Sequence, residues 1–280
     1  MTINTLSGGK TSSYVAANYI ANYDVFALVR IEDKKSKFPD KKIRQIVEDK
    51  IQAPFIATAE DDMIIYTMLD LEQFIGRKIT WVTGKTFDQV LDGAGTLPDP
   101  LRRFCTAQMK IEPMFNWWKK NINRPCEFRL GFRANEKKRA NKTLDKTNSN
   151  GFLEMKSIVG KRGSLNKWGM IEWQKPVFPL ISDNIFKDTI EEFWKNKPVR
   201  FAWMNNCVGC FHKTPLLINK MWDKHKTKLE WFASKERIKH NKDVWYKDKN
   251  LSFNDIKKWN KQIELFDDDF NECDSGYCGI

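Results

Sequence analysis

The chain has 280 residues, with 48 Lys and Arg against 36 Asp and Glu, and a formal net charge of +12. It contains no apolar run of about 18 residues, which excludes a membrane-spanning helix from the expectations, and we see no basic-then-apolar leader. We therefore expect a cytoplasmic protein with reduced cysteines and no membrane partner. The positive charge favours a polyanionic partner, either nucleic acid or a highly charged nucleotide, although a Lys- and Asn-rich genome would also produce it.

Strand and helix patterns alternate over the first half of the chain. The predicted strands, short and mostly apolar, cover residues 3–6, 25–31, 55–58, 79–83 and 127–131. The predicted helices cover residues 12–22, 41–51, 63–75, 86–91 and 108–121. This order is typical of an α/β fold with a doubly wound parallel sheet that helices cover on both faces.

The alternation lapses in the second half. Residues 141–175 are rich in Lys, Asn, Ser and Gly and predict a loop insert with a β-hairpin that ends at 168–173. A helix is expected at 185–194, and short helices and loops after 206. We therefore expect an α/β domain over residues 1–200 and a helical, cysteine-bearing C-terminal region over 201–280.

A glycine-rich loop, Ser7-Gly8-Gly9-Lys10-Thr11-Ser12, joins the first predicted strand to the first predicted helix. Glycines let backbone N–H groups approach an anion, and a helix N-terminus adds partial positive charge, so this pattern favours phosphate binding. A Walker A loop needs an earlier glycine where this chain has Asn4, so the loop is too short for that motif. A glycine turn without a ligand remains the alternative.

The loop resembles the SGGxxS or SGGKDS loop of the ATP-pyrophosphatase superfamily, with Thr11 where many members have Asp. In that superfamily it holds the pyrophosphate of ATP or the phosphosulfate end of a sulfonucleotide, and Mg²⁺ can accompany the phosphates. Two further segments are similar to the phosphoadenosine phosphosulfate (PAPS) reductase family. They are LGFRANE at 130–136 followed by Arg139, and RRFCT at 102–106 followed by KIEP at 110–113.

The resemblance implies an adenine nucleotide alpha-hydrolase-like fold for residues 1–200, with Lys10 and Arg133 in catalytic roles. Asp33, which follows the second predicted strand, is a candidate contact to ribose or adenine, or else a solvated loop acid. The expected nucleotide-binding residues are Ser7, Gly8, Gly9, Lys10, Thr11, Ser12, Asp33, Gly131 and Arg133.

The cysteine pattern at 207–210, Cys-x-x-Cys, favours a metal or redox site in a reducing compartment. In the iron–sulfur branch of the PAPS reductase family, a Cys-Cys pair joins a later Cys-x-x-Cys around a [4Fe–4S] cluster. Cys105 aligns with the first cysteine of that pair, and Thr106 replaces the second. The implied ligands are Cys105, Cys207, Cys210 and Cys273, although Cys278 could take the place of Cys273. Zinc with His212 as a fourth ligand, and buried free thiols, are the competing interpretations.

The segment Cys278-Gly279-Ile280 resembles the E-C-G-φ-H stretch of PAPS reductases, where φ is apolar, but lacks its Glu and His. The resemblance implies that the Cys278 thiolate attacks the sulfur of a sulfonucleotide and that a thioredoxin-like reductant clears the resulting thiosulfonate. A frayed terminus is the alternative.

Three functions remain. The expected one is reductive cleavage of PAPS or adenylyl sulfate, which the cysteine tail favours. The second is ATP-dependent adenylation followed by sulfur insertion into tRNA or DNA, which the positive charge and the 141–175 insert favour. The third is a non-catalytic nucleotide-sensing or nucleic-acid-binding module. Tryptophans such as Trp222 and Trp231 could stack bases for such a partner, or belong to the core.

Overall fold

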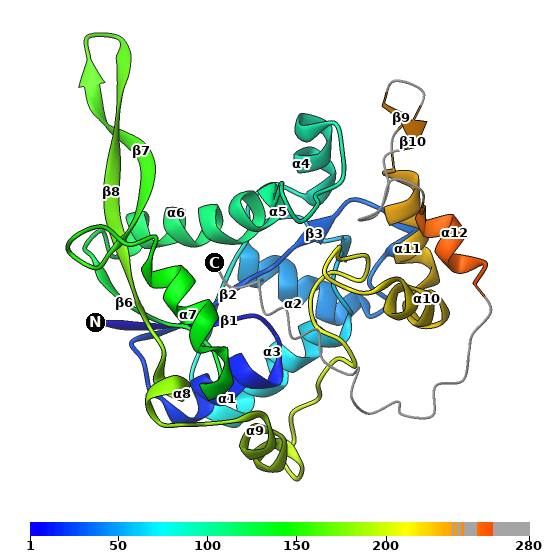
Figure 1. Cartoon of the computed structure of the whole chain (residues 1–280), viewed down its shortest axis with the longest axis horizontal. Coiled ribbons are helices and arrows are strands. Elements are labelled where there is room, and N and C mark those ends of the chain that lie inside the picture. The colour runs from blue at the N-terminus through cyan, green and yellow to red at the C-terminus, as the bar shows by residue number, and fades with distance from the viewer. Residues whose placement is uncertain (237, 240–241, 244–250, 260–280) are drawn as a thin grey trace.

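The computed structural model describes residues 1–236, 238–239, 242–243 and 251–259. Its centre is a six-stranded, mostly parallel sheet with helices on both faces (Figure 1). The strand order is β5-β2-β1-β6-β8-β7. The strands are β1 (Thr2–Leu6), β2 (Tyr23–Ala27), β5 (Ile79–Val82), β6 (Cys126–Arg129), β7 (Leu153–Arg162) and β8 (Leu165–Val177). This α/β architecture is compatible with the doubly wound class predicted from the sequence.

The chain reverses its direction of winding at β1. β1 pairs in parallel with β2 on one side and with β6 on the other. The chain first builds outward through β2 to β5, then returns across the sheet to β6 and β8. In open α/β sheets the loops that follow two such strands diverge, which opens a crevice at their carboxyl ends.

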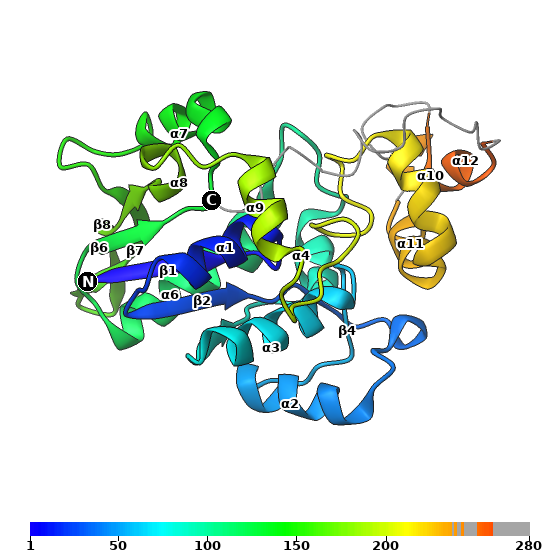
Figure 2. The same cartoon turned by 90° about the horizontal axis from the view of Figure 1, so that it is seen from below.

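Two apolar clusters bury the two faces of the sheet. On one face, side chains of α1 (Lys10–Asn18), α3 (Met63–Ile75) and α9 (Lys187–Trp194) pack against β1, β2 and β5. On the other face, Phe115 and Trp118 of α6 (Glu112–Asn121) pack against Phe128 and Trp173. Figure 2 shows α1 and α6 on opposite sides of the sheet.

The second predicted strand, 25–31, is divided. β2 ends at Ala27, and β3 (Arg30–Ile31) then pairs antiparallel with β4 (Ala57–Thr58) in a separate two-stranded sheet. The expected strand 55–58 therefore lies outside the central sheet. The apolar run predicted one continuous strand because Leu28 and Val29 are also buried, but they are buried where the chain leaves the sheet.

The segment 141–175 is more ordered than the predicted loop insert. It begins within α7 (Lys137–Leu144), and β7 and β8 then form a long antiparallel hairpin. The second half of β8 runs parallel to β6, from the pair Cys126–Gln174 to the pair Arg129–Val177. The expected hairpin insert thus supplies a strand of the central sheet.

The C-terminal region contributes short helices that share an apolar cluster with residues of β3, β4 and α4. They are α10 (Pro215–Lys224), α11 (Lys226–Ser234) and α12 (Phe253–Lys257), with β9 (Ile238–Lys239) and β10 (Lys242–Asp243) as a small ladder. The domain boundary at 200/201 stays a prediction. None of the helices in the described part of the chain is long and apolar enough to cross a membrane.

The remaining elements connect these layers. They are η1 (Lys34–Ser36), α2 (Lys41–Ile51), α4 (Phe87–Ala94), α5 (Phe104–Thr106), the π-helical turn η2 (Ala107–Ile111), η3 (Ala134–Glu136) and α8 (Pro179–Ser182).

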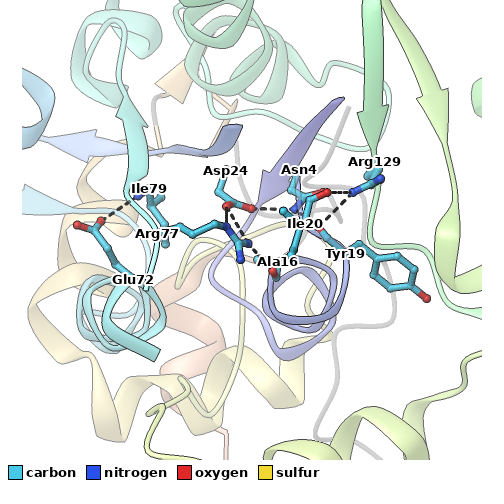
Figure 3. A network of polar contacts seen from close by, with 9 residues as sticks. All are labelled: Asn4, Ala16, Tyr19, Ile20, Asp24, Glu72, Arg77, Ile79 and Arg129. Atoms are coloured by element: carbon cyan, nitrogen blue, oxygen red, sulfur yellow. Dashed lines mark hydrogen bonds and ion pairs between the residues drawn. The ribbon is translucent and has the colours of Figure 1, made fainter. Parts of the chain in front are cut away.

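The C-terminal end of α1 is fastened to the sheet by polar side chains (Figure 3). Asn4 donates to the Tyr19 carbonyl and to Asp24, each at 2.8 Å. Arg77 donates to the Ala16 carbonyl at 2.6 Å and forms an ion pair with Asp24 at 3.1 Å. Arg129 donates to the Tyr19 and Ile20 carbonyls at 3.1 and 2.8 Å. Cationic groups thus satisfy the carbonyls that a helix leaves unpaired at this end.

Candidate functional site

A cavity of about 540 Å³ lies where the chain reverses, at the carboxyl ends of β1 and β6. Its wall combines the loop after β1, the segment after β6, α9 and residues 201–206. Ligand sites of open α/β sheets occupy this position. Those of its lining residues that were predicted to bind nucleotide are Ser7, Gly9, Lys10, Thr11, Ser12, Gly131 and Arg133.

Two glycines let the loop after β1 pack closely against its neighbours, α3 on one side and the segment after β6 on the other. Gly8 has φ of +81°, and a Cβ there would lie 2.5 Å from Cγ2 of buried Ile64. A Cβ on Gly131 would lie 3.2 Å from Cα of Ser12. A side chain at position 131 would push apart the two backbone segments that form the crevice, and one at position 8 would push the loop away from α3.

The N-terminal end of α1 opens into this cavity. Gly9 is the N-cap, no acidic residue occupies the first turn, and none of the described side chains caps the helix. Ser12 stabilises the loop internally, because its Oγ accepts from Ser7 N and donates to the Gly9 carbonyl, each at 3.1 Å. A helix end with N–H groups and no cap is a favourable place for an anion.

Five cationic side chains and two carboxylates line the cavity. Three of the cations are held by these two carboxylates. Lys10 contacts Glu191 of α9, and both side chains are about one-third exposed. Arg133, almost buried, and Arg139 both bind the carboxylate of Glu136, at 3.2 and 2.8 Å. The site therefore has an excess of positive charge.

Lys110 connects the cavity wall to a buried acid. Its ammonium group lies 2.9 Å from Oε1 of Glu60, which is fully buried. The Glu60 carbonyl accepts from buried Lys228 at 2.5 Å, and Lys228 also lies 2.7 Å from Asp62. This pairing fixes Lys110 at the edge of the cavity.

Apolar groups supply the rest of the wall. Phe132 stacks on Phe178 with ring centres 5.2 Å apart, and the Arg139 guanidinium lies 3.8 Å from the Phe132 ring centre. Leu130 and Met114 also line the cavity. A volume with one anion-binding end and apolar walls suits a ligand that joins a planar ring to charged groups.

Cys105, Cys207 and Cys210 line a second, smaller cavity of about 30 Å³. The buried ammonium group of Lys213 shapes their loop by donating to the carbonyls of Asn205 and Cys207 at 3.0 and 2.7 Å. Asn205 itself lines the larger cavity, so one loop borders both cavities. Within the described ranges, no group of three or more His, Cys, Asp or Glu side chains is arranged to hold a metal ion.

The other predicted residues lie elsewhere. Gly8 supports the loop from behind, against Ile64, and does not line the cavity. Asp33 does not line it either. Its carboxylate caps η1, accepting from the Lys35 and Ser36 backbone N–H groups and from the Ser36 hydroxyl. Cys273 and Cys278 lie outside the described residues.

Cys126, Trp222, Trp231 and His225 lie inside the protein, where they contact other parts of the chain. Cys126 is buried in β6, and burial raises the pKa of its thiol. Trp222 and Trp231 are buried in the core and cannot stack on bases. His225 is mostly buried, and its Nε2 lies 3.2 Å from Oδ2 of Asp61.

Sequence reasoning missed three residues of the larger cavity: Lys187, Glu191 and Asn205. None belongs to a motif near the glycine loop, and Glu191 is 181 positions from Lys10. The one available signal for Glu191 is the predicted helix that carries it, whose packing on α1 depends on the tertiary fold.

Comparison with known proteins gave no match: no family model fits the chain, and neither the curated proteins nor the solved structures include a similar one. Functional interpretation therefore depends on the residues and geometry described above.

Proposed function

We propose that this chain is a PAPS-reductase-like enzyme that binds an adenine nucleotide or sulfonucleotide in the larger cavity. The observation that supports this most is the meeting of two separate motifs. Lys10 and Gly9 of the glycine loop and Arg133 of the LGFRANE segment line one cavity, although more than 120 positions separate them. A chance glycine turn would not be expected to face the second motif across a crevice.

The charges suggest how the ligand would lie. Its phosphate or sulfate end would occupy the N-terminal end of α1, near Lys10 and Arg133, where N–H groups and cations are available. The adenine would contact the apolar wall that includes Leu130 and Met114. Glu191 would release Lys10 when the anion binds, since the ion pair is partly exposed and readily exchanged.

The reaction that we favour is reductive cleavage of PAPS or adenylyl sulfate. The thiolate of Cys278 would attack the sulfur, the S–O bond to the nucleotide would break, and the nucleotide phosphate would leave with the electron pair. A dithiol such as thioredoxin would then release sulfite from the enzyme thiosulfonate and become a disulfide. Lys10 and Arg133 would stabilise the negative charge on the leaving phosphate.

The presence of three cysteines in the lining of the smaller cavity supports a thiolate-held group as part of this proposal. Cys105, Cys207 and Cys210 would be ligands of a [4Fe–4S] cluster, with Cys273 as the fourth, or of zinc with His212. When bound, either group would cross-link the 205–210 loop to α5. Iron, sulfide and zinc analysis of anaerobically purified protein tests this. Cys207→Ser should remove the metal, whereas Cys126→Ser, which alters a core thiol, should not.

Sulfite release tests the reaction. Wild-type protein incubated with adenylyl sulfate or PAPS and reduced thioredoxin should form sulfite, and a sulfonate adduct should appear on Cys278 when thioredoxin is omitted. Cys278→Ser should abolish both while leaving nucleotide binding intact. Sulfite release at the wild-type rate in that variant would overturn the assigned nucleophile.

A second candidate function is ATP-dependent adenylation and sulfur insertion into tRNA or DNA, with Mg²⁺ bound to the ATP phosphates. The exposed β7–β8 hairpin favours it, because its outer part carries cations and no acids. In this case ATP should yield pyrophosphate only when tRNA or DNA is added, and the rate should fall steeply with salt. Nucleotide binding without either reaction would indicate the sensing module instead.

A further inference from the structure

The β7–β8 hairpin forms an arm that extends beyond the rest of the described chain (Figure 1). Only its base is packed: Met155 and Ile171 contact the core cluster on the α6 face. Lys119 of α6 makes a polar contact further out, donating to the Ser157 hydroxyl at 2.9 Å and to the Ile158 carbonyl at 3.0 Å. Beyond this point most side chains of both strands are exposed.

Charge is distributed unevenly along this arm. Its outer part, residues 155–170, contains Lys156, Lys161, Arg162 and Lys167, and it has no Asp or Glu. The acids are at the base, where Glu154 and Glu172 are cross-strand neighbours and Asn148 donates to both. The outer arm is therefore a positively charged ribbon that would attract a polyanion.

One face of the ribbon combines Lys156 with exposed apolar side chains, and Lys161 shares it because it pairs with Asn166, two positions from Trp168. Ile158 pairs with Trp168 and Lys156 pairs with Met170, so the four side chains share a face. Trp168 is 57% exposed and Met170 56%. The Lys156 ammonium group lies 6.0 Å from the Trp168 ring centre. An exposed tryptophan among cations is the arrangement with which proteins hold unpaired bases and their phosphates.

The arm is also continuous with the larger cavity. β8 carries Trp168 on the outer arm and Trp173 in the cavity wall. The two positions are five residue steps apart along the extended strand, or about 17 Å. A strand of nucleic acid held by the arm would thus be near the proposed nucleotide site.

We propose that the outer β7–β8 arm binds a single-stranded segment of nucleic acid, with a base stacked on Trp168 and phosphates on Lys156 and Lys161, which share its face. A membrane surface is less well matched, because the exposed apolar groups alternate with cations along a narrow ribbon. An acidic protein would need no exposed tryptophan among the cations. The inference deepens the second candidate function and rests on it for its biological meaning, but binding can be measured without the reaction.

The experiment measures fluorescence anisotropy of labelled 20-nucleotide single-stranded DNA and RNA, and of a DNA duplex, with the full chain at several salt concentrations. Lys156→Glu/Lys161→Glu should weaken single-strand binding at least about tenfold and reduce the salt slope by about two. Trp168→Ala should weaken it about 5- to 100-fold. Comparing the affinity for single-stranded DNA with that for single-stranded RNA distinguishes the two sources of the strand.

Matched control variants distinguish binding by this surface from a general effect of the protein's net charge or of any exposed tryptophan. Lys41→Glu/Lys42→Glu changes the net charge equally on exposed α2, and Trp259→Ala removes another exposed tryptophan. Both should change the affinity less than twofold. Equal losses in arm and control variants would overturn the proposal, as would arm-dependent binding that favours the duplex, or arm-dependent binding only to phosphatidylserine vesicles.

Lys10→Ala separates the two proposals. It should leave single-strand binding unchanged while weakening ATP binding. If Lys10→Ala loses ATP binding but still binds the single strand, the result concerns the nucleotide cavity alone. If the wild type binds ATP but its single-strand binding does not depend on the arm residues, only the proposal about the arm is refuted. Thermal melts of each arm variant should match the wild type, because the outer arm has few packed side chains.

Discussion

The two ends of α1 differ in the hydrogen-bond partners that the rest of the described chain gives them. At the C-terminal end, Asn4, Arg77 and Arg129 donate to the last carbonyls of the helix. At the N-terminal end, Gly9 contributes no capping side chain and the first turn opens into a cavity lined by cations. Both ends of a helix leave backbone groups unpaired, so both require partners.

This difference indicates which end serves the fold and which end serves a ligand. The C-terminal partners belong to the protein itself, and Asp24, which is 2% exposed, fixes Arg77 and Asn4 in place. The N-terminal partners must come from solvent or from a bound molecule. Because the helix dipole and Lys10 favour negative charge there, we expect an anion to complete the N-terminal end.

Removing a side chain that binds the C-terminal end of α1 should cause the largest loss of stability. Arg77→Ala removes two hydrogen-bond donors and leaves the buried Asp24 carboxylate without its cation, which should lower the free energy of unfolding by about 3 kcal/mol. Chemical denaturation measures the loss. Nucleotide affinity of the folded variant should be unchanged, and a loss of affinity larger than the loss of stability would contradict the division between the two ends.

A side chain introduced into the glycine loop should cause the next largest loss of stability. Gly8→Ala places a side chain at φ of +81° and against Ile64, and should lower the free energy of unfolding by about 2 kcal/mol or more. Gly76→Ala is the matched control, because Gly76 has φ of +62° but open space around its Cβ. It should lose about 1 kcal/mol. Equal losses in the two variants would show that Ile64 does not confine the loop.

A helix with its own cap offers a sharper contrast with α1. α4 begins with a capping box of Thr86 and Gln89 and has Asp88 in its first turn. Burial alone would raise the pKa of Asp88, but hydrogen bonds from Lys235, the Glu32 backbone and Trp231 lower that pKa below its usual value overall. Since the folded-state pKa is depressed, the stabilisation is present above the unfolded value and is lost as pH falls through the folded value.

We therefore expect Asp88→Asn to lower the free energy of unfolding by about 0.5–1 kcal/mol at pH 7. The difference from the wild type should shrink below about pH 4, where the unfolded chain takes up the proton first. Urea unfolding at a series of pH values measures it. A difference that is independent of pH would show that the charge of Asp88 contributes nothing.

The smallest expected change is in nucleotide affinity, when Glu191, the acid that pairs with Lys10, is replaced. Glu191→Gln removes a carboxylate that competes with the ligand, so nucleotide affinity should rise about two- to fivefold, in the range of a partly exposed ion pair. Glu192→Gln on the same helix is the control, because Glu192 pairs with Lys195 and is 73% exposed. Weaker binding in Glu191→Gln would instead place Glu191 in contact with the ligand.

Local signals predicted part of this structure. α2 and α3 have the bounds expected from their apolar spacing, with Asp40 capping α2 and Gly76 ending α3. Arg133 was expected near the loop residues because the LGFRANE segment resembles a phosphate-binding stretch of the PAPS reductase family. The division of the second strand after Ala27 could not be predicted, because burial continues where the chain leaves the sheet.

Other features depend on contacts between distant segments. The hairpin was predicted, but the place of β8 in the central sheet was not, because its outer residues are exposed and only residues near Trp173 follow a buried pattern. Glu191 reaches the site only because α9 packs on α1. Asp33 was expected near the ligand from its place after an apolar run, but that run ends in η1, where its carboxylate is used as a cap.

Calorimetric titration of ATP and of adenylyl sulfate into wild-type and Lys10→Ala protein tests the central claim most directly. We predict one nucleotide per chain for the wild type and a loss of about 1.5–3 kcal/mol of binding free energy in the variant, the range for hydrogen bonds to charged groups. The melting temperature should barely change, because Lys10 is partly exposed. Unchanged affinity in Lys10→Ala, or no binding of either nucleotide to the wild type, would contradict the assignment of the N-terminal end of α1 to an anionic ligand.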